Sequence, residues 1–173
     1  MGTFSVLVED AELLKEVGDA SSVAIIGCTN CANISIAYAK DISPIGKSSL
    51  FGIKYTPHAV IREANRIKDL LEDKGKSVVI MIFSRTSSPP CGMHEKERGM
   101  IAETCRNIDA GVTLCCNSGW EGIKSALPES FKTIPGMKAV GILNAYLNKD
   151  GANDLLDKEK TKIIYFTELA ERV

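Results

Sequence analysis

Short apolar runs recur along the chain, each bounded by glycine, serine, proline or charged residues. Runs of this length that are rich in Val and Ile are typical of β-strands. An apolar run without polar alternation indicates a strand that is covered on both faces, as in a parallel sheet. The pattern predicts five strands, at Ser22–Gly27, Ser77–Phe83, Gly111–Cys115, Met137–Leu143 and Lys162–Phe166.

Between the apolar runs, hydrophobic residues recur at the three- and four-residue spacing of amphipathic helices. The clearest case is Pro57–Lys74, where Thr56 can cap the first turn, Pro57 suits the first helical position and Gly75 follows the last turn. The segment Ser43–Thr56 is rich in Gly, Ser and Pro and is predicted to be a loop. The spacing predicts helices over Asp10–Val17, Ala32–Lys40, Pro57–Lys74, His94–Arg106, Trp120–Leu127 and Asp150–Asp157.

The alternation of strands and helices predicts an α/β fold. We expect a single three-layer domain over residues 1–173, with a mostly parallel, roughly five-stranded sheet that is Rossmann-like or flavodoxin-like. A chain of 173 residues is long enough to form one such domain around a well-packed core. In these sheets, ligands bind beyond the carboxyl ends of the strands. The loops that follow the strands are therefore the expected place for a functional site.

The balance of charges excludes several classes of partner. The chain has 21 Lys and Arg against 22 Asp and Glu, and only 6% of its residues are aromatic. Neither a basic surface nor a platform for stacked bases is expected, so nucleic acid is not a predicted partner. No apolar run approaches the roughly 20 residues that span a bilayer, and the first residues lack the pattern of a secretory signal. The protein is therefore expected to be cytoplasmic, without a membrane partner.

Six cysteines are the main chemical feature of the chain. In a reducing compartment, cysteines serve more often as metal ligands or catalytic thiols than as structural disulfides. Because parallel strands end at one edge of a sheet, cysteines that follow them are expected to lie together. Five of the six follow predicted strands: Cys28, Cys31, Cys91, Cys115 and Cys116. Cys105 falls inside a predicted helix and is expected in the core, and burial as small apolar side chains is the alternative for the other five.

The strongest motif is Cys28-Thr-Asn-Cys31, at the start of a predicted helix. Two thiolates with this spacing can bind one metal, and the helix N-terminus favours the thiolate form that both metal binding and redox chemistry use. Cys91-Gly-Met-His94 has the spacing of a second ligand pair, which would complete a Cys3His zinc site. In the alternative, His94 is an exposed residue at a helix start and a fourth cysteine completes the ligand set of a four-iron cluster.

The candidate fourth cysteines, Cys115 and Cys116, are adjacent in the chain. Neighbouring residues of a strand point to opposite faces, so only one of the two is expected to join the site. The segment Asn117-Ser-Gly-Trp-Glu-Gly122 follows them, and backbone N–H groups near Asn117, Gly119 and Trp120 can bind a cofactor there. The alternative is an ordinary strand-to-helix turn, in which Trp120 packs over the end of the sheet and shields the thiols from water.

One part of the chain resembles a known family. Leu13-Leu14-Lys15, followed by Val23-Ala-Ile-Ile-Gly-Cys-Thr-Asn-Cys-Ala32, resembles the cysteine-rich C-terminal domain associated with methylenetetrahydrofolate reductases of anaerobes. Members of that family are linked to iron–sulfur or zinc binding in one-carbon and corrinoid metabolism. The resemblance implies metal ligation by Cys28 and Cys31, and a partner oxidoreductase or corrinoid protein. This chain has Ile34-Ser-Ile-Ala where the family has a third cysteine and Gly-Gly-Glu.

Three functions are consistent with these features. The first is a metal-binding accessory protein that holds an iron–sulfur cluster or zinc. The second is a thiol–disulfide oxidoreductase that uses Cys28 and Cys31, with Ile134-Pro135 in the place of the cis-proline of thioredoxin-like proteins. The third is a non-catalytic domain that binds a small molecule or a partner subunit at Ser43–Thr56. Association into a homo-oligomer is compatible with all three.

Overall fold

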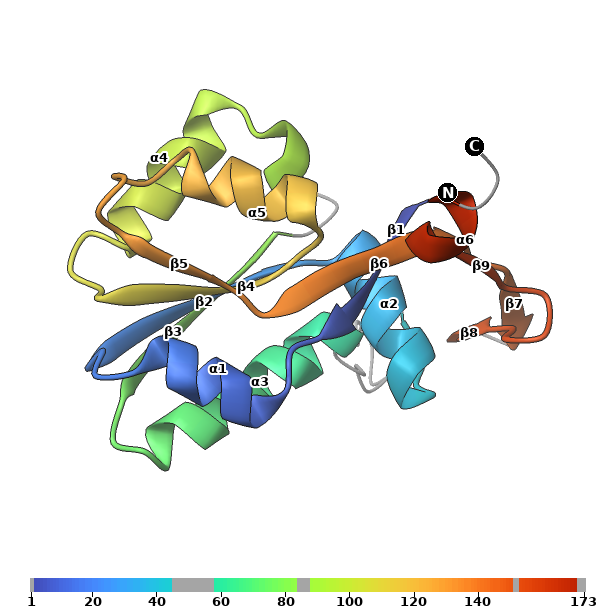
Figure 1. The fold of residues 1–173 in the computed structure, drawn as a ribbon, viewed down its shortest axis with the longest axis horizontal. Helices are drawn as coiled ribbons and strands as arrows, with labels where there is room; N and C mark the ends of the chain where they lie inside the picture. Colours follow the sequence, from blue (N-terminus) through green and yellow to red (C-terminus); the bar gives the residue numbers. More distant parts are fainter. Residues whose placement is uncertain (1, 45–57, 84–87, 151–152, 171–173) are drawn as a thin grey trace, which may run out of the picture.

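A four-stranded parallel sheet forms the centre of the α/β fold. The computed structural model describes residues 2–44, 58–83, 88–150 and 153–170. The strands lie in the order β3-β2-β4-β5, and each pairs in parallel with its neighbours. The chain passes from β2 to β3 on one side and then returns to β4 on the other, so the direction of winding reverses between β2 and β4 (Figure 1). The four strands are β2 (Ser22–Cys28), β3 (Ser77–Phe83), β4 (Ala110–Leu114) and β5 (Lys132–Pro135).

Helices cover both faces of this sheet (Figure 1). On one face lie α1 (Asp10–Val17) and α3 (Ala59–Glu72), and on the other lie α4 (Glu95–Thr104) and α5 (Asn117–Lys124). The buried apolar side chains of α3 recur at the spacing predicted from the sequence, which confirms that helix. The proposed cap and first residue of that helix, at positions 56 and 57, lie outside the described residues, as does most of the predicted loop 43–56.

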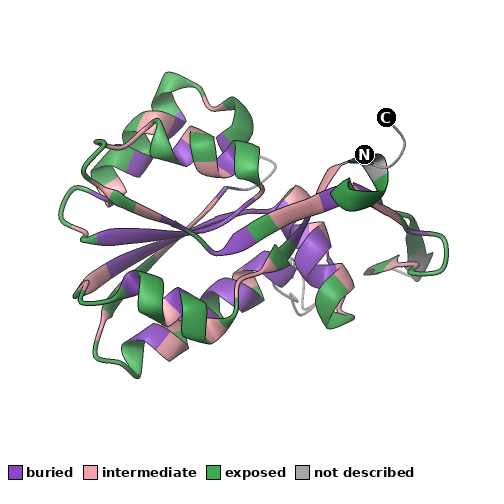
Figure 2. Ribbon diagram, viewed as in Figure 1, coloured by how far each residue is buried: buried purple, intermediate pink, exposed green. Residues whose placement is uncertain are grey.

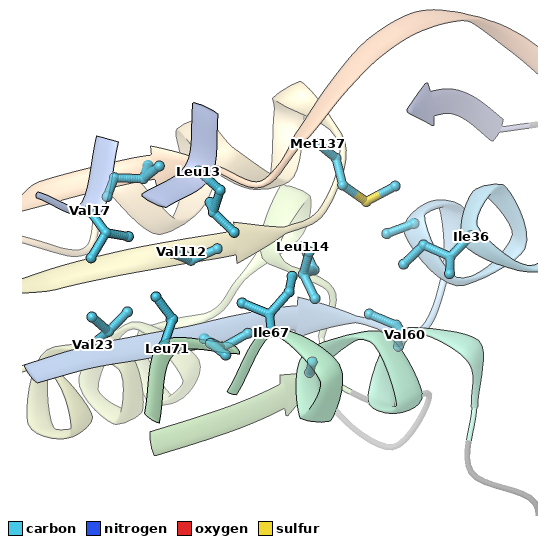
Figure 3. Close-up of a cluster of buried hydrophobic side chains, with 14 of the residues drawn as sticks. Leu13, Val17, Val23, Ile36, Val60, Ile67, Leu71, Val112, Leu114 and Met137 are labelled. Atoms are coloured by element: carbon cyan, nitrogen blue, oxygen red, sulfur yellow. The ribbon is translucent and has the colours of Figure 1, made fainter. Parts of the chain in front are cut away.

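The alternation of side chains along β2 divides the core into two clusters. Val23 and Ile25 pack with α1 and α3, in the cluster drawn in Figure 3. Ala24, Ile26 and Cys28 belong to the second cluster, with side chains of α4 and α5. Successive residues of a strand point to opposite faces, so the last residue of β2 is directed to the α4 and α5 side. β2 and β4 are buried along almost their whole length (Figure 2).

A second, antiparallel sheet lies beyond the carboxyl end of the parallel one. Its central strand, β6 (Met137–Asn144), follows β5 closely and pairs with β1 (Gly2–Leu7) on one side and β9 (Lys162–Tyr165) on the other. The helix α2 (Cys31–Lys40) packs against β1, where the rings of Phe4 and Tyr38 meet edge to face. This arrangement brings the first residues of the chain to the end of β2.

The structure corrects the predicted sheet of roughly five mostly parallel strands. The runs at 137–143 and 162–166 do contain strands, but both strands pair antiparallel in the second sheet. Apolar content indicates a strand without specifying its direction or its partner, which is why the two were assigned to the wrong sheet. β3 was expected to be covered on both faces, yet it is an edge strand and Val79 is 37% exposed.

Other predicted elements differ in kind or in extent. The helix predicted at 150–157 is replaced by a hairpin of β7 (Leu147–Asp150) and β8 (Asn153–Leu156). The dipeptide Asp150-Gly151 is typical of tight hairpin turns, so it favours a hairpin over a helix in this segment of the sequence. A short helix, α6 (Phe166–Ala170), follows β9, and β1 and β5 were not predicted. Within the described ranges, no helix has the length and apolar character needed to cross a membrane.

Candidate thiol site

Five cysteines meet at the carboxyl edge of the parallel sheet. Cys28 is the last residue of β2, Cys31 is the first residue of α2, and Cys115 and Cys116 follow β4 directly. Cys91 comes from the short 3-10 turn Pro90–Gly92, between β3 and α4. All five line one cavity of about 20 Å³, which is room for about one water-sized sphere. The predicted gathering of these cysteines is therefore present in the structure.

Both adjacent cysteines line this cavity, although only one was expected to do so. The expectation rested on strand alternation, but β4 ends at Leu114 and Cys116 is the N-cap of α5. Alternation does not apply beyond the end of a strand. Cys105 lies apart from the cavity, at the C-cap of α4, and is buried in the second core cluster.

The site has a deep side and an open side. Cys28 and Cys115 are buried, Cys31 and Cys116 are half-buried, and Cys91 is exposed. The less buried three also line an open hollow of about 500 Å³, together with Gly2, Thr3, Ser118 and Ile142. A ligand held among the sulfurs would therefore be enclosed from the sheet side and accessible from the side of β1 and β6.

Two of the thiols form a hydrogen-bonded pair, although they come from distant parts of the chain. The Cys31 thiol donates to the Cys116 sulfur, and this contact is the main cause that holds the pKa of Cys116 well below its usual range. The backbone N–H groups of Gly119 and Ser118, at the start of α5, and the Thr3 hydroxyl act in the same direction, while burial opposes them. The structure thus favours a thiolate at Cys116.

Three other thiols of the cavity, those of Cys28, Cys31 and Cys115, are held in the neutral form. The pKa of Cys31 is raised, first because its proton is held in the bond to Cys116 and then because of burial. Burial raises the pKa of Cys28 to about 11 and also raises that of Cys115. Desolvation disfavours a charged sulfur in an apolar pocket unless hydrogen-bond donors compensate for it. Only at Cys116, among these four thiols, do the donors outweigh the burial.

Alkylation of the metal-free protein should reveal this difference between the thiols. At about pH 6.5, well below the ordinary cysteine pKa of about 8.5, we expect iodoacetamide to label Cys116 first. The thiolate is the reactive form, so a lowered pKa keeps Cys116 reactive at a pH where ordinary thiols are protonated. Peptide mapping by mass spectrometry measures the labelling. If exposure alone governed reactivity, Cys91 would be labelled first, and that result would contradict the assignment.

Two glycines of α5 allow the turn that carries Cys91 to lie directly against this helix. A Cβ atom at Gly122 would lie 1.8 Å from the Pro90 carbonyl oxygen, and one at Gly119 would lie 3.2 Å from the Cys115 sulfur. Both glycines lie on the same face of α5, one turn apart. They allow the helix to approach the turn and the cavity closely, and in this way they bring Cys91 to the other cysteines.

Of the other predicted site residues, one lines the cavity and the rest lie outside its lining. His94 is the N-cap of α4, is exposed and does not belong to the lining of the cavity. Gly119 lines the cavity and Trp120 packs in the second core cluster, with the Lys124 ammonium 5.1 Å from its ring centre. The Asn117 side-chain oxygen accepts a hydrogen bond from the Ala139 N–H of β6 at 3.4 Å. Asn117 therefore links α5 to the antiparallel sheet.

Sequence reasoning missed two residues of this site, Gly2 and Thr3. A Cβ atom at Gly2 would lie 3.0 Å from the Cys31 sulfur, and Thr3 hydrogen-bonds to both Cys31 and Cys116. The signal was present in the run Phe4-Ser-Val-Leu-Val8, in which four of five residues are apolar and three are β-branched or aromatic, as is typical of a strand.

All described peptide bonds are trans, including Ile134–Pro135, so the cis-proline expected for a thioredoxin-like protein is not found at that position. Pro135 instead pairs with Thr113 at the end of β5.

No family model matches the chain, and no similar protein was found among curated proteins or solved structures.

Proposed function

We propose that this protein binds a metal ion or an iron–sulfur cluster through thiolates at the carboxyl edge of its parallel sheet. The observation that carries the proposal is the single cavity lined by five cysteines from three separate segments of the chain. Cysteines buried only for packing have no physical reason to converge on one small cavity from distant segments. Convergence of this kind is what thiolate ligation requires.

The donor chemistry of the cavity fits such a group. Among the residues that the structure describes, its lining contains five sulfurs and no carboxylate, imidazole, ammonium or guanidinium group. Thiolate sulfur is the donor preferred by zinc in structural sites and by iron–sulfur clusters, whereas magnesium and calcium require oxygen. The donor atoms of the cavity are therefore compatible with either zinc or an iron–sulfur cluster.

Ligand binding would require the thiols to reorient. In the ranges that the structure describes, no three His, Cys, Asp or Glu side chains are already arranged to hold a metal ion. Rotation of a cysteine between its staggered χ1 rotamers moves the sulfur and leaves the backbone in place. The proposal therefore involves rotation of these side chains, together with loss of the thiol protons that metal binding displaces.

The position of the cavity supports the same proposal. Counted in chain order within the sheet, the strands lie as 2-1-3-4, the start of the flavodoxin-like order. We propose that the fold is a flavodoxin-like variant with an added antiparallel sheet. Ligands of such sheets bind where the winding reverses, outside the carboxyl ends of the strands. Cys28 is the last residue of β2 and Cys115 follows β4, the two strands between which the winding reverses.

Metal content and a visible absorption spectrum, measured on protein purified without oxygen, test the proposal. We expect close to one zinc per chain in a colourless protein, or iron and sulfide in a brown one. Protein that carries neither as purified, and that binds neither Zn²⁺ nor a reconstituted cluster, would exclude the proposal.

The resemblance of residues 13–32 to the domain associated with methylenetetrahydrofolate reductases extends the proposal to a partner. By that resemblance, the partner would be an oxidoreductase or a corrinoid protein in one-carbon metabolism. The open side of the site, toward Gly2, Thr3 and Ile142, is where such a partner could approach the bound group.

A second candidate function is thiol–disulfide exchange, and the hydrogen-bonded pair of Cys31 and Cys116 favours it. The Cys116 thiolate would attack one sulfur of a substrate disulfide and release one thiol. Cys31 would then lose its proton, attack the Cys116 sulfur and release the second thiol. The reactive pair would be Cys31 with Cys116, in place of the Cys28 and Cys31 pair expected from the sequence.

An insulin-reduction assay, with dithiothreitol as the reductant, separates these two pairings. We expect any such activity to be lost in Cys31→Ser and in Cys116→Ser and to be retained in Cys28→Ser. Loss in Cys28→Ser with retention in Cys116→Ser would instead support the pairing within the CxxC motif. Absence of activity in the unaltered protein would eliminate this candidate.

A further inference from the structure

Thr3, at the start of β1, contacts both members of the hydrogen-bonded thiol pair. Its backbone N–H donates to the Cys31 sulfur, and its hydroxyl donates to the Cys116 sulfur. These donors reach the sulfurs from the open side of the site, opposite the buried Cys28 and Cys115. Thr3 therefore connects α2, which carries Cys31, with the loop between β4 and α5, which carries Cys116.

The register of β1 explains why this amide is available. β1 is an edge strand that pairs only with β6 among the described residues, so part of its backbone faces away from the sheet. On that outer edge, the Ser5 N–H donates to the Ser35 hydroxyl oxygen at 3.1 Å, and the Ser35 hydroxyl donates to the Thr3 carbonyl at 3.4 Å. Ser35 thus holds β1 against α2, with the Thr3 amide facing Cys31.

The close approach of β1 to the thiols supports this geometry independently. A Cβ atom at Gly2 would lie only 3.0 Å from the Cys31 sulfur, so the backbone passes directly over that side chain. Gly2 and Thr3 also line the open hollow together with Cys31, Cys91 and Cys116. The start of β1 is therefore one wall of the site.

We propose that Thr3 is a positioning residue of the thiol site, which orients the sulfurs of Cys31 and Cys116 toward a bound metal or cluster. This inference rests on the proposed metal-binding function. Groups that hydrogen-bond to metal ligands fix their orientation, and their removal typically lowers metal affinity about 10- to 100-fold. Hydrogen bonds to sulfur also influence the reduction potential of iron–sulfur clusters.

The test compares Thr3→Val, which keeps the shape of the side chain and removes the hydroxyl, with Thr3→Ser, which keeps the hydroxyl. Zn²⁺ affinity is measured by competition with a chromophoric chelator on reduced protein. We expect Thr3→Val to bind Zn²⁺ about tenfold more weakly or worse, and Thr3→Ser to stay within about twofold of the unaltered protein. With Co²⁺ as the probe, the sulfur-to-metal absorption band should shift in Thr3→Val and be restored in Thr3→Ser.

Ser35→Ala is the matched control. It removes the two hydrogen bonds that Ser35 makes with β1 and keeps the Thr3 hydroxyl, which is the group that Thr3→Val removes. We expect this variant to unfold at lower denaturant concentration while binding Zn²⁺ almost normally. If Ser35→Ala loses as much affinity as Thr3→Val, strand packing accounts for the effect and the inference is wrong.

The outcomes also separate this inference from the proposed function. If the unaltered protein binds Zn²⁺ and Thr3→Val binds it equally well with an unchanged Co²⁺ spectrum, the positioning role is excluded and the metal site stands. If the unaltered protein binds neither Zn²⁺ nor Co²⁺ nor a reconstituted cluster, the proposed function itself fails. If the protein is purified with an iron–sulfur cluster, the cluster's midpoint potential in the same variants replaces Zn²⁺ affinity, with the same ordering expected.

Discussion

Replacing Cys28 and Cys31 together with serine is expected to abolish stoichiometric binding of zinc or of an iron–sulfur cluster. Serine oxygen is a poor substitute for thiolate toward these metals, and the double change removes two of the five sulfurs that line the cavity. Cys28 belongs to the deep side of the site, and Cys31 borders the open side. Metal analysis and the visible spectrum of protein purified without oxygen measure the loss.

Cys105→Ala is the control for this experiment, because it removes a thiol that lies outside the cavity. Cys105 is buried in the second core cluster, so its replacement should lower stability modestly without changing metal content. Equal metal loss in Cys105→Ala and in the double variant would mean that stability, and not ligation, governs binding. An unchanged metal content in the double variant would contradict ligation by this pair.

Gly122→Ala is expected to destabilise the protein and to displace Cys91 from the other cysteines. The added Cβ would lie 1.8 Å from the Pro90 carbonyl oxygen, a backbone atom that side-chain rotation cannot move. Either α5 or the turn Pro90–Gly92 has to shift. Overpacking of this kind typically costs about 1–3 kcal/mol. Chemical denaturation measures the stability, and metal affinity reports whether Cys91 still reaches the site.

Gly99→Ala provides the matched control on a neighbouring helix. Gly99 lies within α4, is exposed, and a Cβ atom there would have no neighbour within 4 Å. Because alanine is favoured over glycine in a helix by about 0.5–1 kcal/mol, this change should stabilise the protein slightly. If both variants were equally stable, the close approach of α5 to the Cys91 turn would be disproved.

Local sequence pattern was sufficient for three of the four parallel strands and for the location of the thiols. The apolar runs around Val23, Ile80 and Val112 predicted three strands of one sheet, and the structure confirms them. Because parallel strands end at a common edge, the cysteines that follow them were expected to meet, and they line one cavity. This inference needs only the period of the side chains and the common direction of the strands, and both are properties of short segments.

Strand direction and pairing partners were decided by tertiary structure. The apolar runs at 137–143 and 162–166 look the same in sequence whether their neighbours run parallel or antiparallel, and here they pair antiparallel in a second sheet. The same sheet brings Gly2 and Thr3 to the thiols, through contacts between residues that are more than 100 positions apart, such as Thr3 with Ile142.

The chemistry of the individual cysteines also depends on those distant contacts. In sequence, Cys28 and Cys31 form the obvious pair, but in the folded chain the Cys31 thiol hydrogen-bonds to Cys116. The protonation of each sulfur is set by burial and by donors from β1 and α5, which no local pattern contains. The sequence alone therefore located the thiols, while only the packing of β1 and α5 around them determined which sulfur carries the charge and which are paired.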